Sequence, residues 1–427
     1  MSKKPEDMFS FDEIADDCVK CGKCIPVCTI HNINADEVTS PRGFIDLLGE
    51  YKRGNLELDK TAKDIFESCF LCTNCVEVCP KSLPTDMIIE QVRSDIAQKY
   101  GIAWYKKAFF LLLRHRWLND LAFKMGWVFQ TCGFKIKADI DSMHSRFNIP
   151  MLKADRLLPS LKKTSFLNAH RENINNGGKR KVAIFIGCLG NYNFRNIGDS
   201  LLEILEALEI DAFLAKSQKC CSAPAYFTGD FDTVDYNAKF NIEYFEKFAD
   251  DVEAILVPEA TCSAMLKIDY EHYFHDQPEW KERARKVMKK VFMATEWLQH
   301  HTELETILAQ KEQIPKIVTY HDPCHAKKMQ GIHEEPRNLI RQNYKIVEMS
   351  DPNRCCGFGG VTMQSEKYEF AKAAGAPKAA MIKETGAEIV SAECSACRMQ
   401  INASMNYAEV DTIFKNPIEL IAEALRK

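Results

Sequence analysis

The sequence lacks a long hydrophobic run and a nucleotide-binding glycine motif. In its most aromatic region, the longest uninterrupted apolar stretch is Ala108 to Leu113, whereas a helix that spans a bilayer needs about 20 residues. We therefore predict no transmembrane helix. Neither G-x-G-x-x-G nor a P-loop occurs, and the GFGG at 357–360 is not followed by a dinucleotide fingerprint. Nothing in the sequence indicates a flavin or nicotinamide site.

A secretory signal is also missing from the start of the chain. The segment MSKKPEDMFSFDEIADDC has no apolar core and no cleavage-site pattern. We therefore expect a cytoplasmic protein whose thiols stay reduced. Most of the 18 cysteines fall in C-x-x-C runs or adjacent pairs. In a large chain kept in a reducing compartment, this pattern favours metal ligation over disulfides.

Charge divides the 427 residues into regions, although the net charge is only −4. Residues 1–100 carry 12 Lys/Arg and 18 Asp/Glu, residues 101–180 carry 15 and 5, and residues 181–427 are acidic again. The turn-rich segment NNGGKRK at 175–181 indicates a linker. We predict a domain at 1–100, a basic aromatic connector at 101–180, and two further domains at 181–315 and 316–427.

The most specific motif is the run C-x-x-C-x-x-C-x-x-x-C, which occurs twice in the first hundred residues. Pro80 follows the second copy, whereas Thr29 follows the first. In bacterial ferredoxins, three closely spaced cysteines bind one [4Fe–4S] cluster and the fourth binds the other. Paired zinc sites do not require the third short-spaced cysteine. The spacing predicts two [4Fe–4S] clusters, one held by Cys18, Cys21, Cys24 and Cys79, the other by Cys69, Cys72, Cys75 and Cys28.

Residues 181–427 read as two similar halves. Each half repeats the order strand, Cys, helix, strand, Cys-Cys, helix, strand, Cys, which indicates an internal duplication. The expected strands lie within 182–188, 211–215 and 254–262, then within 316–324, 344–349 and 387–394. Corresponding cysteines have similar separations: 32 against 31 residues (Cys188 to Cys220, Cys324 to Cys355) and 41 against 38 (Cys221 to Cys262, Cys356 to Cys394).

Strands that alternate with helices predict a mainly parallel sheet in each half, with sites at the carboxyl ends of the strands. The fold class is therefore a helical two-cluster domain followed by a duplicated α/β domain. We expect two groups of convergent thiols. The first nest comprises Cys188, Cys220, Cys221 and Cys262, and the second nest comprises Cys324, Cys355, Cys356, Cys394 and Cys397.

The two nests differ in number of thiols. Five thiolates in the second exceed the four that tetrahedral zinc uses, which favours an iron–sulfur cluster or another redox-active site. Four thiolates in the first suit either zinc or a cubane cluster. Met265 is aligned here with Cys397, so the first nest has one cysteine fewer.

The motifs IGCLGNYN, KCCSAP, YHDPCHAKKM, RCCGFGG and AECSAC resemble the CCG cysteine-rich domains of heterodisulfide reductase and of respiratory dehydrogenase iron–sulfur subunits. The C-terminal half is similar to the iron–sulfur subunit of anaerobic glycerol-3-phosphate dehydrogenase, through GC-x-x-NYN, YH-x-PCH-x-x-KM and AAGAP. The segment SPRGFIDLLGEYKRGN is similar to the glycolate oxidase iron–sulfur subunit. The resemblance implies that a full CCG motif can hold a noncubane [4Fe–4S] cluster. Ser222 replaces the expected glycine in the first nest.

The segment 101–137 combines basic and aromatic residues, with seven Lys/Arg, one Asp and three of the five tryptophans. A basic amphipathic helix with tryptophans suits an anionic membrane surface. The alternatives are a helix that docks a partner protein and a segment that belongs to the body of the cysteine-rich domains. Five of the seven basic residues interrupt the apolar faces of this helix: Lys106, Lys107, Arg114, Arg116 and Lys124. The chain shows no nucleic-acid-binding module and is acidic overall, so we expect no nucleic-acid partner. Cys132 stands alone in an apolar stretch and is expected in the core.

A relay protein without a substrate-oxidising cofactor needs a partner that has one. We interpret the chain as the electron-transfer subunit of a flavin-linked dehydrogenase that oxidises glycerol 3-phosphate or a 2-hydroxy acid such as glycolate or lactate. An FAD-dependent subunit would supply electrons, and membrane quinone would accept them at the inner face of the cytoplasmic membrane. The alternatives are a heterodisulfide or thiol reductase that acts at the second nest, and a non-enzymatic metal-binding assembly factor.

Overall fold

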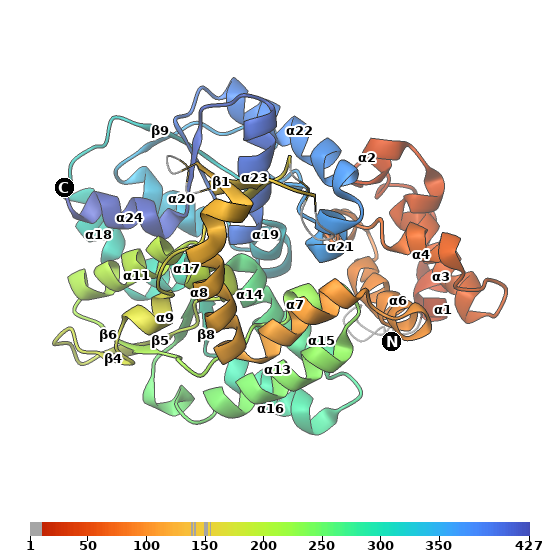
Figure 1. Ribbon diagram of the computed structural model, residues 1–427, viewed down its shortest axis with the longest axis horizontal. Coiled ribbons are helices and arrows are strands. Elements are labelled where there is room, and N and C mark those ends of the chain that lie inside the picture. Colours follow the sequence, from red (N-terminus) through yellow and green to blue (C-terminus); the bar gives the residue numbers. More distant parts are fainter. Residues whose placement is uncertain (1–10, 138–139, 141, 149–152, 154) are drawn as a thin grey trace.

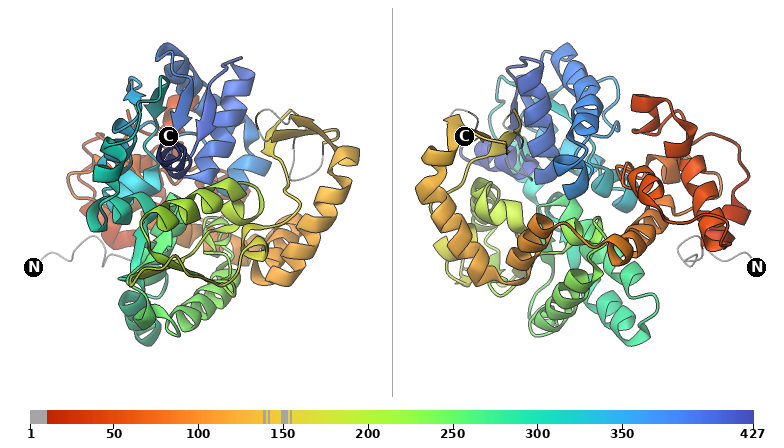
Figure 2. Two further views of the ribbon diagram at one scale, coloured as in Figure 1. Left: turned by 90° about the vertical axis from the view of Figure 1, so that its left-hand side faces the viewer. Right: turned by 45° about the vertical axis from the view of Figure 1, so that its right-hand side comes forward.

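The computed structural model describes residues 11–427 apart from 138–139, 141, 149–152 and 154. Figure 1 shows the N-terminal helices as a lobe at one end of a larger α/β body. In Figure 2 the chain runs from this lobe through α7 and α8 across the body. The cysteine-dense region and the two halves of the C-terminal region therefore lie against one another.

The N-terminal lobe is helical, as the sequence predicts. The side chain of Ser40 accepts a hydrogen bond from the backbone of Gly43 and so caps α3, and Asp59 caps α4 in the same way through Ala62. Phe44 and Phe66 are buried between these helices. The helices are α1 (Phe11–Asp17), α2 (His31–Asn34), α3 (Pro41–Lys52), α4 (Lys60–Phe66), α5 (Asn74–Glu77) and α6 (Thr85–Tyr100).

The predicted connector contains two helices and short strands. His115 has an extended backbone and separates α7 (Trp104–Arg114) from α8 (Arg116–Gly133). An antiparallel sheet follows, made of β1 (Phe134–Lys137), β2 (Ser142–Ser145) and β3 (Leu157–Pro159), then α9 (Phe166–Ala169) and β4 (Asn173–Ile174). Strand β4 pairs with β6 of the first large sheet, although it precedes the predicted boundary near residue 180.

The two halves of the body have the same strand order, which agrees with the predicted duplication. The first sheet has the order β4-β6-β5-β7-β8, and the second has β10-β9-β11-β12. All neighbours in them pair in parallel except β4, which is antiparallel to β6. The strands are β5 (Lys181–Ile184), β6 (Asp211–Leu214), β7 (Ile255–Val257), β8 (Val291–Met293), β9 (Ile317–Tyr320), β10 (Lys345–Ile346), β11 (Ile389–Ser391) and β12 (Ile413–Lys415).

The remaining helices follow the strands and complete each half. In the first half they are α10 (Cys188–Tyr192), α11 (Arg195–Ala207), α12 (Ala223–Tyr226), α13 (Phe231–Phe245), α14 (Ala260–Ala264), a π-helical turn (Met265–Asp269), α15 (Tyr270–Tyr273), α16 (Pro278–Met288), α17 (Ala294–His301) and α18 (Leu304–Ala309). In the second half they are α19 (Cys324–Gln330), α20 (Glu334–Arg341), α21 (Gly360–Ser365), α22 (Tyr368–Glu384), α23 (Ser395–Tyr407) and α24 (Pro417–Leu425).

The two halves share a hydrophobic core. Helix α24 of the second half packs on α11 of the first, and α17 of the first packs on α20 of the second. Leu205, Trp297, Ile340 and Ile421 from these four helices belong to one buried cluster. Because an apolar core of this kind resists relative movement of its elements, the fold holds the two nests in a fixed relation.

Candidate iron–sulfur sites

The eight cysteines of the N-terminal lobe converge into two groups. One cavity is lined by Cys18, Cys21, Cys24, Cys75 and Cys79. A second cavity is lined by Cys28, Cys69, Cys72 and Cys75. The fourth cysteine of each copy therefore lies beside the first three of the other copy. This geometry agrees with the predicted crossed arrangement, and the ligand roles themselves stay predictions.

The two cysteine loops have the same backbone conformation, which explains how they curl around a site. In both copies, left-handed residues occur two and four positions after the first cysteine: Lys20 and Gly22, then Leu71 and Thr73. In the second loop, the turn lets the Leu71 N–H donate to the Cys69 sulfur at 3.4 Å. Hydrogen bonds of this kind tune the potential of a bound cluster.

The donor set fits an iron–sulfur cofactor. Burial raises the pKa of Cys28 and of Cys69 to about 12, so neither thiol ionises at neutral pH without a cation nearby. Metal binding supplies that cation and releases the thiol proton. Soft thiolates are the ligands that iron–sulfur clusters use. Residues of both loops would hold such clusters, and a bound cluster supplies one-electron storage.

The crossed arrangement makes a specific prediction for Cys79. Replacement of Cys79 by Ser should lower the iron content from about eight atoms towards about four, because one [4Fe–4S] site loses a ligand. The lost paramagnetic signal should be that of the site with Cys18, Cys21 and Cys24. Cys28→Ser is the matched comparison and should remove the other signal. If Cys79→Ser instead removes the signal of the Cys69 site, the crossing is wrong.

The first nest forms at the carboxyl ends of β5, β6 and β7, as the topology predicts. Cys188 begins α10, Cys220 and Cys221 follow β6, and Cys262 lies in α14. The Cys221 thiol donates to the Cys262 sulfur at 3.4 Å, and Cys188 hydrogen-bonds Cys220. A cavity lined by Leu113, Arg116, Cys188 and Cys220 places this nest beneath α7 and α8. The structure brings all four predicted thiols together.

The second nest forms in the same way in the other half. Cys324 begins α19, Cys355 and Cys356 precede α21, and Cys397 lies in α23, with Cys394 capping that helix. The Cys356 thiol donates to the Cys397 sulfur at 3.4 Å, and the Cys397 N–H donates to the Cys394 sulfur at 3.3 Å. Cys324 is close enough to Cys394 for their charges to interact. All five predicted thiols converge.

The sequence alignment of the two nests is wrong at one position. It pairs Cys262 with Cys394 and Met265 with Cys397. In the structure, Cys262 corresponds to Cys397: each is the third residue of its helix, and each lies 41 residues after the cysteine that it contacts. The similar letters Cys-Ser-Ala at 262–264 and 394–396 favour the other alignment, but the loop before α23 is one residue longer than that before α14.

Cys394 is therefore the additional thiol of the second nest, and Glu259 holds the equivalent capping position before α14. The Glu259 carboxylate accepts a hydrogen bond from the Ser395 N–H at 2.8 Å and another from the Ser395 hydroxyl. A residue of the first half thus caps the helix that carries Cys397. The two nests are directly linked through this contact.

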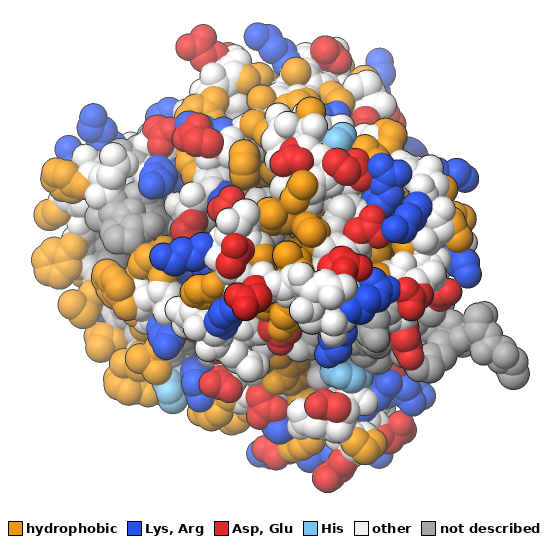
Figure 3. Space-filling model, turned by 90° about the vertical axis from the view of Figure 1, so that its right-hand side faces the viewer, with side chains coloured by type: hydrophobic (Ala, Val, Ile, Leu, Met, Phe, Trp, Pro, Cys, Tyr) orange, Lys and Arg blue, Asp and Glu red, His pale blue; other side chains and the backbone are white. Residues whose placement is uncertain are grey.

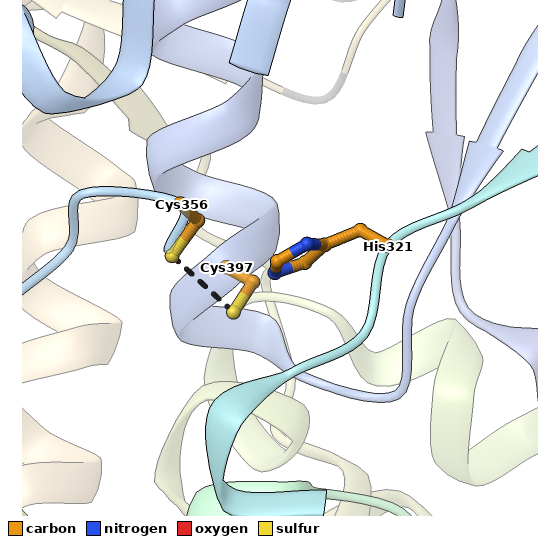
Figure 4. Close-up of side chains that lie close together, drawn as sticks. All are labelled: His321, Cys356 and Cys397. Atoms are coloured by element: carbon orange, nitrogen blue, oxygen red, sulfur yellow. Dashed lines mark hydrogen bonds between the residues drawn. The ribbon is translucent and has the colours of Figure 1, made fainter. Parts of the chain in front are cut away.

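His321 adds an imidazole to the second nest, a feature that sequence reasoning did not assign as a ligand. Its Nε2 atom and the sulfurs of Cys356 and Cys397 all lie within 4.8 Å of one another (Figure 4). Nδ1 donates to the Pro352 carbonyl at 3.1 Å, so Nε2 carries the lone pair. Burial lowers the pKa of His321 well below its ordinary value, which keeps the ring neutral. The signal in the sequence is the YHDPC motif, in which His321 lies three residues before Cys324.

The second N-terminal site abuts the second nest. The side chains of Cys72 and Cys355 are hydrogen-bonded to each other. The Lys328 ammonium donates to the carbonyl oxygens of Cys72 and Asn353, both at 3.2 Å, and to the Asn74 side chain. Arg93 also donates to the carbonyls of Cys69 and Phe227. These contacts fix the lobe on the body with two groups of thiols in contact.

The basic segment differs from the expected amphipathic helix. Lys106 is buried, 2.8 Å from the Glu366 carboxylate and 3.0 Å from the Thr362 hydroxyl. Arg114 lies over the Tyr236 ring, and Arg116 pairs with Asp120 and Asn168. These three basic side chains therefore stabilise the fold, which agrees for them with the alternative that the segment belongs to the body of the cysteine-rich domains and not with a membrane-facing surface.

The outer face of α8 is apolar. Trp117, Leu121, Met125, Val128 and Phe129 are exposed along it. Figure 3 shows hydrophobic side chains gathered along its left-hand edge, the side on which α8 lies. Cys132 is exposed on the same helix, so its predicted place in the core is wrong. Among the described residues, the structure contains no helix that is both long enough and apolar enough to cross a bilayer.

Comparisons with known proteins agree with these sites. The cysteine-rich (CCG) domain family matches residues 182–267 and 318–402, and the 4Fe-4S dicluster domain family matches residues 14–83. The chain is 28% identical over 400 residues to the probable glycolate oxidase iron–sulfur subunit of Bacillus subtilis, with 90% of this chain and 87% of the relative covered. It is 30% identical over 409 residues to an uncharacterized iron–sulfur protein of Methanococcus maripaludis, with 94% and 70% covered.

A shorter relative and a solved structure are also similar to this chain. The lactate utilization protein A of Bacillus cereus is 32% identical over 225 residues, which cover 52% of this chain and 90% of the relative. A hypothetical protein from Helicobacter pylori has the same fold, with a TM-score of 0.53 at 11% identity over 98% of this chain and 75% of that one. The chain therefore belongs to the CCG-domain iron–sulfur proteins, with a 4Fe-4S dicluster domain ahead of two cysteine-rich domains.

Proposed function

We propose that this chain is the iron–sulfur electron-transfer subunit of a hydroxy-acid dehydrogenase complex. An FAD-dependent partner subunit oxidises a 2-hydroxy acid such as glycolate or lactate, and this chain passes the electrons on to membrane quinone. The names of two relatives, a glycolate oxidase iron–sulfur subunit and a lactate utilization protein, support the substrate class. The dehydrogenation itself takes place on the partner.

The contact between Cys72 and Cys355 carries this proposal. Cys75 borders both cavities of the N-terminal lobe, and Cys72 touches the second nest. The two candidate sites of the lobe and the second nest of the body therefore form a series in which each site is adjacent to the next. Lys328 holds both sides of the junction, and its positive charge lowers the energy of an electron placed there. A relay needs this serial arrangement, whereas separate structural metal sites do not.

The test is reduction by a flavoprotein. Anaerobically purified protein should lose its visible iron–sulfur absorbance when mixed with a glycolate- or lactate-oxidising flavoprotein encoded beside its gene and the matching hydroxy acid. Omission of the hydroxy acid is the control and should leave the absorbance unchanged. If the flavoprotein turns over with an artificial acceptor but never reduces this chain, the proposed function is wrong. The same result would favour a non-enzymatic assembly factor.

One observation favours a thiol or disulfide reductase as the second candidate. Hydrogen bonding with Cys355 and with Cys397 lowers the pKa of Cys356, and deprotonation would make it a nucleophilic thiolate. However, Cys356 is buried and only 5% exposed, so a bulky disulfide substrate does not reach it in this conformation. Disulfide turnover by the isolated chain with a chemical reductant would establish this alternative.

We further propose that α8 attaches the complex to the membrane surface. Trp117 and Phe129 are 67% and 60% exposed on its apolar face, and Trp104 is 73% exposed on α7. Lys107 and Lys124 are the exposed basic residues of these two helices. Exposed tryptophans beside lysines suit the boundary between lipid headgroups and acyl chains. Quinone in the membrane would then be close to the complex.

The membrane proposal predicts the behaviour of two pairs of substitutions. Lys107→Gln with Lys124→Gln should weaken binding to anionic vesicles by about 2 kcal/mol, roughly 30-fold, because each lysine near the surface contributes about 1 kcal/mol. Trp117→Ser with Phe129→Ser should weaken it at least as much through lost apolar burial. Vesicle sedimentation measures both. Sedimentation that neither pair changes would assign this face to a partner protein.

A further inference from the structure

Two buried carboxyl groups meet where the N-terminal lobe contacts the first half of the body. Glu90 lies on α6 and Asp269 on the π-helical turn before α15, and each is only 4% exposed. The Tyr226 hydroxyl hydrogen-bonds Glu90, whereas Oδ2 of Asp269 has no partner among the described residues. A buried carboxylate is costly unless it is paired or protonated. Neither of these two carboxyl groups takes part in bringing the cysteines together.

The charged and titratable groups that face this pair come from three elements. Asp86 and Arg93 lie on the same face of α6, at i−4 and i+3 from Glu90, and His325 approaches from α19. Tyr226 approaches from α12. Arg93 donates hydrogen bonds to backbone carbonyls of Phe66, Cys69 and Phe227, so it is not a dedicated partner of either carboxylate.

Burial and the repulsion between neighbouring carboxylates keep protons on this pair. Burial raises the pKa of Glu90 well above its ordinary value, and the charge of Asp269 raises it further. Burial raises the pKa of Asp269 to about 7, with Asp86 adding to the effect and His325 opposing it. Glu90 therefore holds a proton at neutral pH, and Asp269 gains or loses one near neutrality. The pair is poised to respond to a change in nearby charge.

The pair lies between candidate redox sites. On one side, Asp86 lines the cavity of the second N-terminal site together with Cys69 and Cys75. On the other, the His325 Nδ1 atom is 3.3 Å from the Cys324 sulfur of the second nest. An electron added at either site therefore raises the negative potential at Glu90 and Asp269, which favours their protonated forms.

A route for protons reaches the pair from the surface. Tyr226 lines a cavity of about 200 Å³ together with Gln91, Ser94, His272 and Tyr273. This space is large enough for several water molecules, and its walls supply polar partners for them. Tyr226 thus borders this cavity, and its hydroxyl is hydrogen-bonded to the Glu90 carboxyl.

We propose that the Glu90–Asp269 pair takes up one proton from the water of this cavity when an electron arrives at the neighbouring iron–sulfur sites. The inference rests on the proposed relay function. The electron comes from the partner flavoprotein, and the proton comes from solvent and forms an O–H bond on a carboxylate oxygen of the pair. When the electron leaves, that O–H bond breaks and the proton returns through Tyr226. The pair thereby keeps the local charge constant during each transfer.

Redox titration at several pH values tests this. In the complete, anaerobically prepared protein, the midpoint potential of the coupled site, read by its paramagnetic signal, should fall by up to about 59 mV per pH unit around pH 7. This value is the tenfold change in proton concentration converted for one electron. Glu90→Gln with Asp269→Asn should flatten this slope. A parental slope of zero, or an unchanged slope in the double variant, would overturn the proposal.

Controls separate this role from a structural one. Asp95→Asn changes another carboxyl of α6 that hydrogen-bonds Tyr51 instead, and it should keep the parental slope. Infrared difference spectra of the parent on reduction should gain the band of a protonated carboxyl, and this readout needs no variant to fold. Absence of the band contradicts the proposal. Because mediators supply the electrons in both experiments, a failed flavoprotein assay leaves these outcomes intact.

Discussion

Replacement of Cys356 by Ser should stop electron delivery to quinone while the two N-terminal sites remain reducible by the partner flavoprotein. The Cys356 thiol is hydrogen-bonded to Cys397 within the second nest, and the adjacent Cys355 contacts Cys72 of the lobe. Under the proposed relay, electrons then enter the lobe but cannot leave it. Stopped-flow absorbance measures the reduction of the N-terminal sites by the flavoprotein. Steady-state assays measure the reduction of quinone.

The matched control for this substitution is Cys132→Ser, an exposed cysteine of α8 outside both nests. It should keep the parental rate of quinone reduction. If Cys356→Ser also keeps that rate, the second nest is structural or serves another reaction. Metal analysis of the full chain sharpens the result: iron above the roughly eight atoms of the lobe supports a cluster in the nests, whereas added zinc without added iron would end the relay in the lobe.

The sequence predicted the body of the fold because its signals are local. Short apolar runs that each precede a cysteine indicated β5, β6, β7, β9, β10 and β11, and parallel topology then required the cysteines to converge. Strands β8 and β12 were missed. They are Val291–Met293 and Ile413–Lys415, and no cysteine follows either of them to mark the end of a strand. Both became visible only through pairing with β7 and β11.

The parts of the site that escaped prediction depend on contacts between distant residues. Lys106 reads as a surface lysine until Glu366 is placed beside it, 260 residues later. The junction of Cys72 with Cys355 likewise follows from docking of the lobe and leaves no trace in spacing. In contrast, the correspondence between Cys262 and Cys397 can be found from the sequence. Each lies 41 residues after the cysteine that it contacts, Cys221 or Cys356. Local letter similarity obscured it.

Arg337→Met should destabilise the body by about 3–5 kcal/mol, because it breaks a buried ion-pair network and leaves a carboxylate behind. The Arg337 guanidinium is 2.6 Å from Asp322 and 2.7 Å from Glu348, and its side chain is only 4% exposed. Asp322 is 2% exposed and retains only Lys327 in the variant. Asp322 lies two residues before Cys324, so the loss also loosens the loop that begins the second nest.

The expected measurement is the shift of the denaturant midpoint, followed by circular dichroism under anaerobic conditions. Arg341→Met is the control one turn along α20. This arginine is 45% exposed, pairs with Glu334 at 3.3 Å and is 3.9 Å from Glu348, so its loss should change stability by about 0.5 kcal/mol or less. Equal shifts of the denaturant midpoint in the two variants would show that the buried network stabilises the fold no more than the exposed ion pair does.

Acid should reduce the difference between parent and Arg337→Met. Burial opposes ionisation of Asp322, but hydrogen bonds and charge from Arg337 and Lys327 outweigh it and lower the pKa of Asp322 below its ordinary value. The stabilisation is therefore complete above the unfolded pKa, about 3.9, and is lost as the pH falls through the lower folded value. The gap between the two unfolding midpoints should be constant from about pH 5 to 8 and shrink below about pH 4. A gap that widens in acid would exclude the Asp322–Arg337 pair as its source.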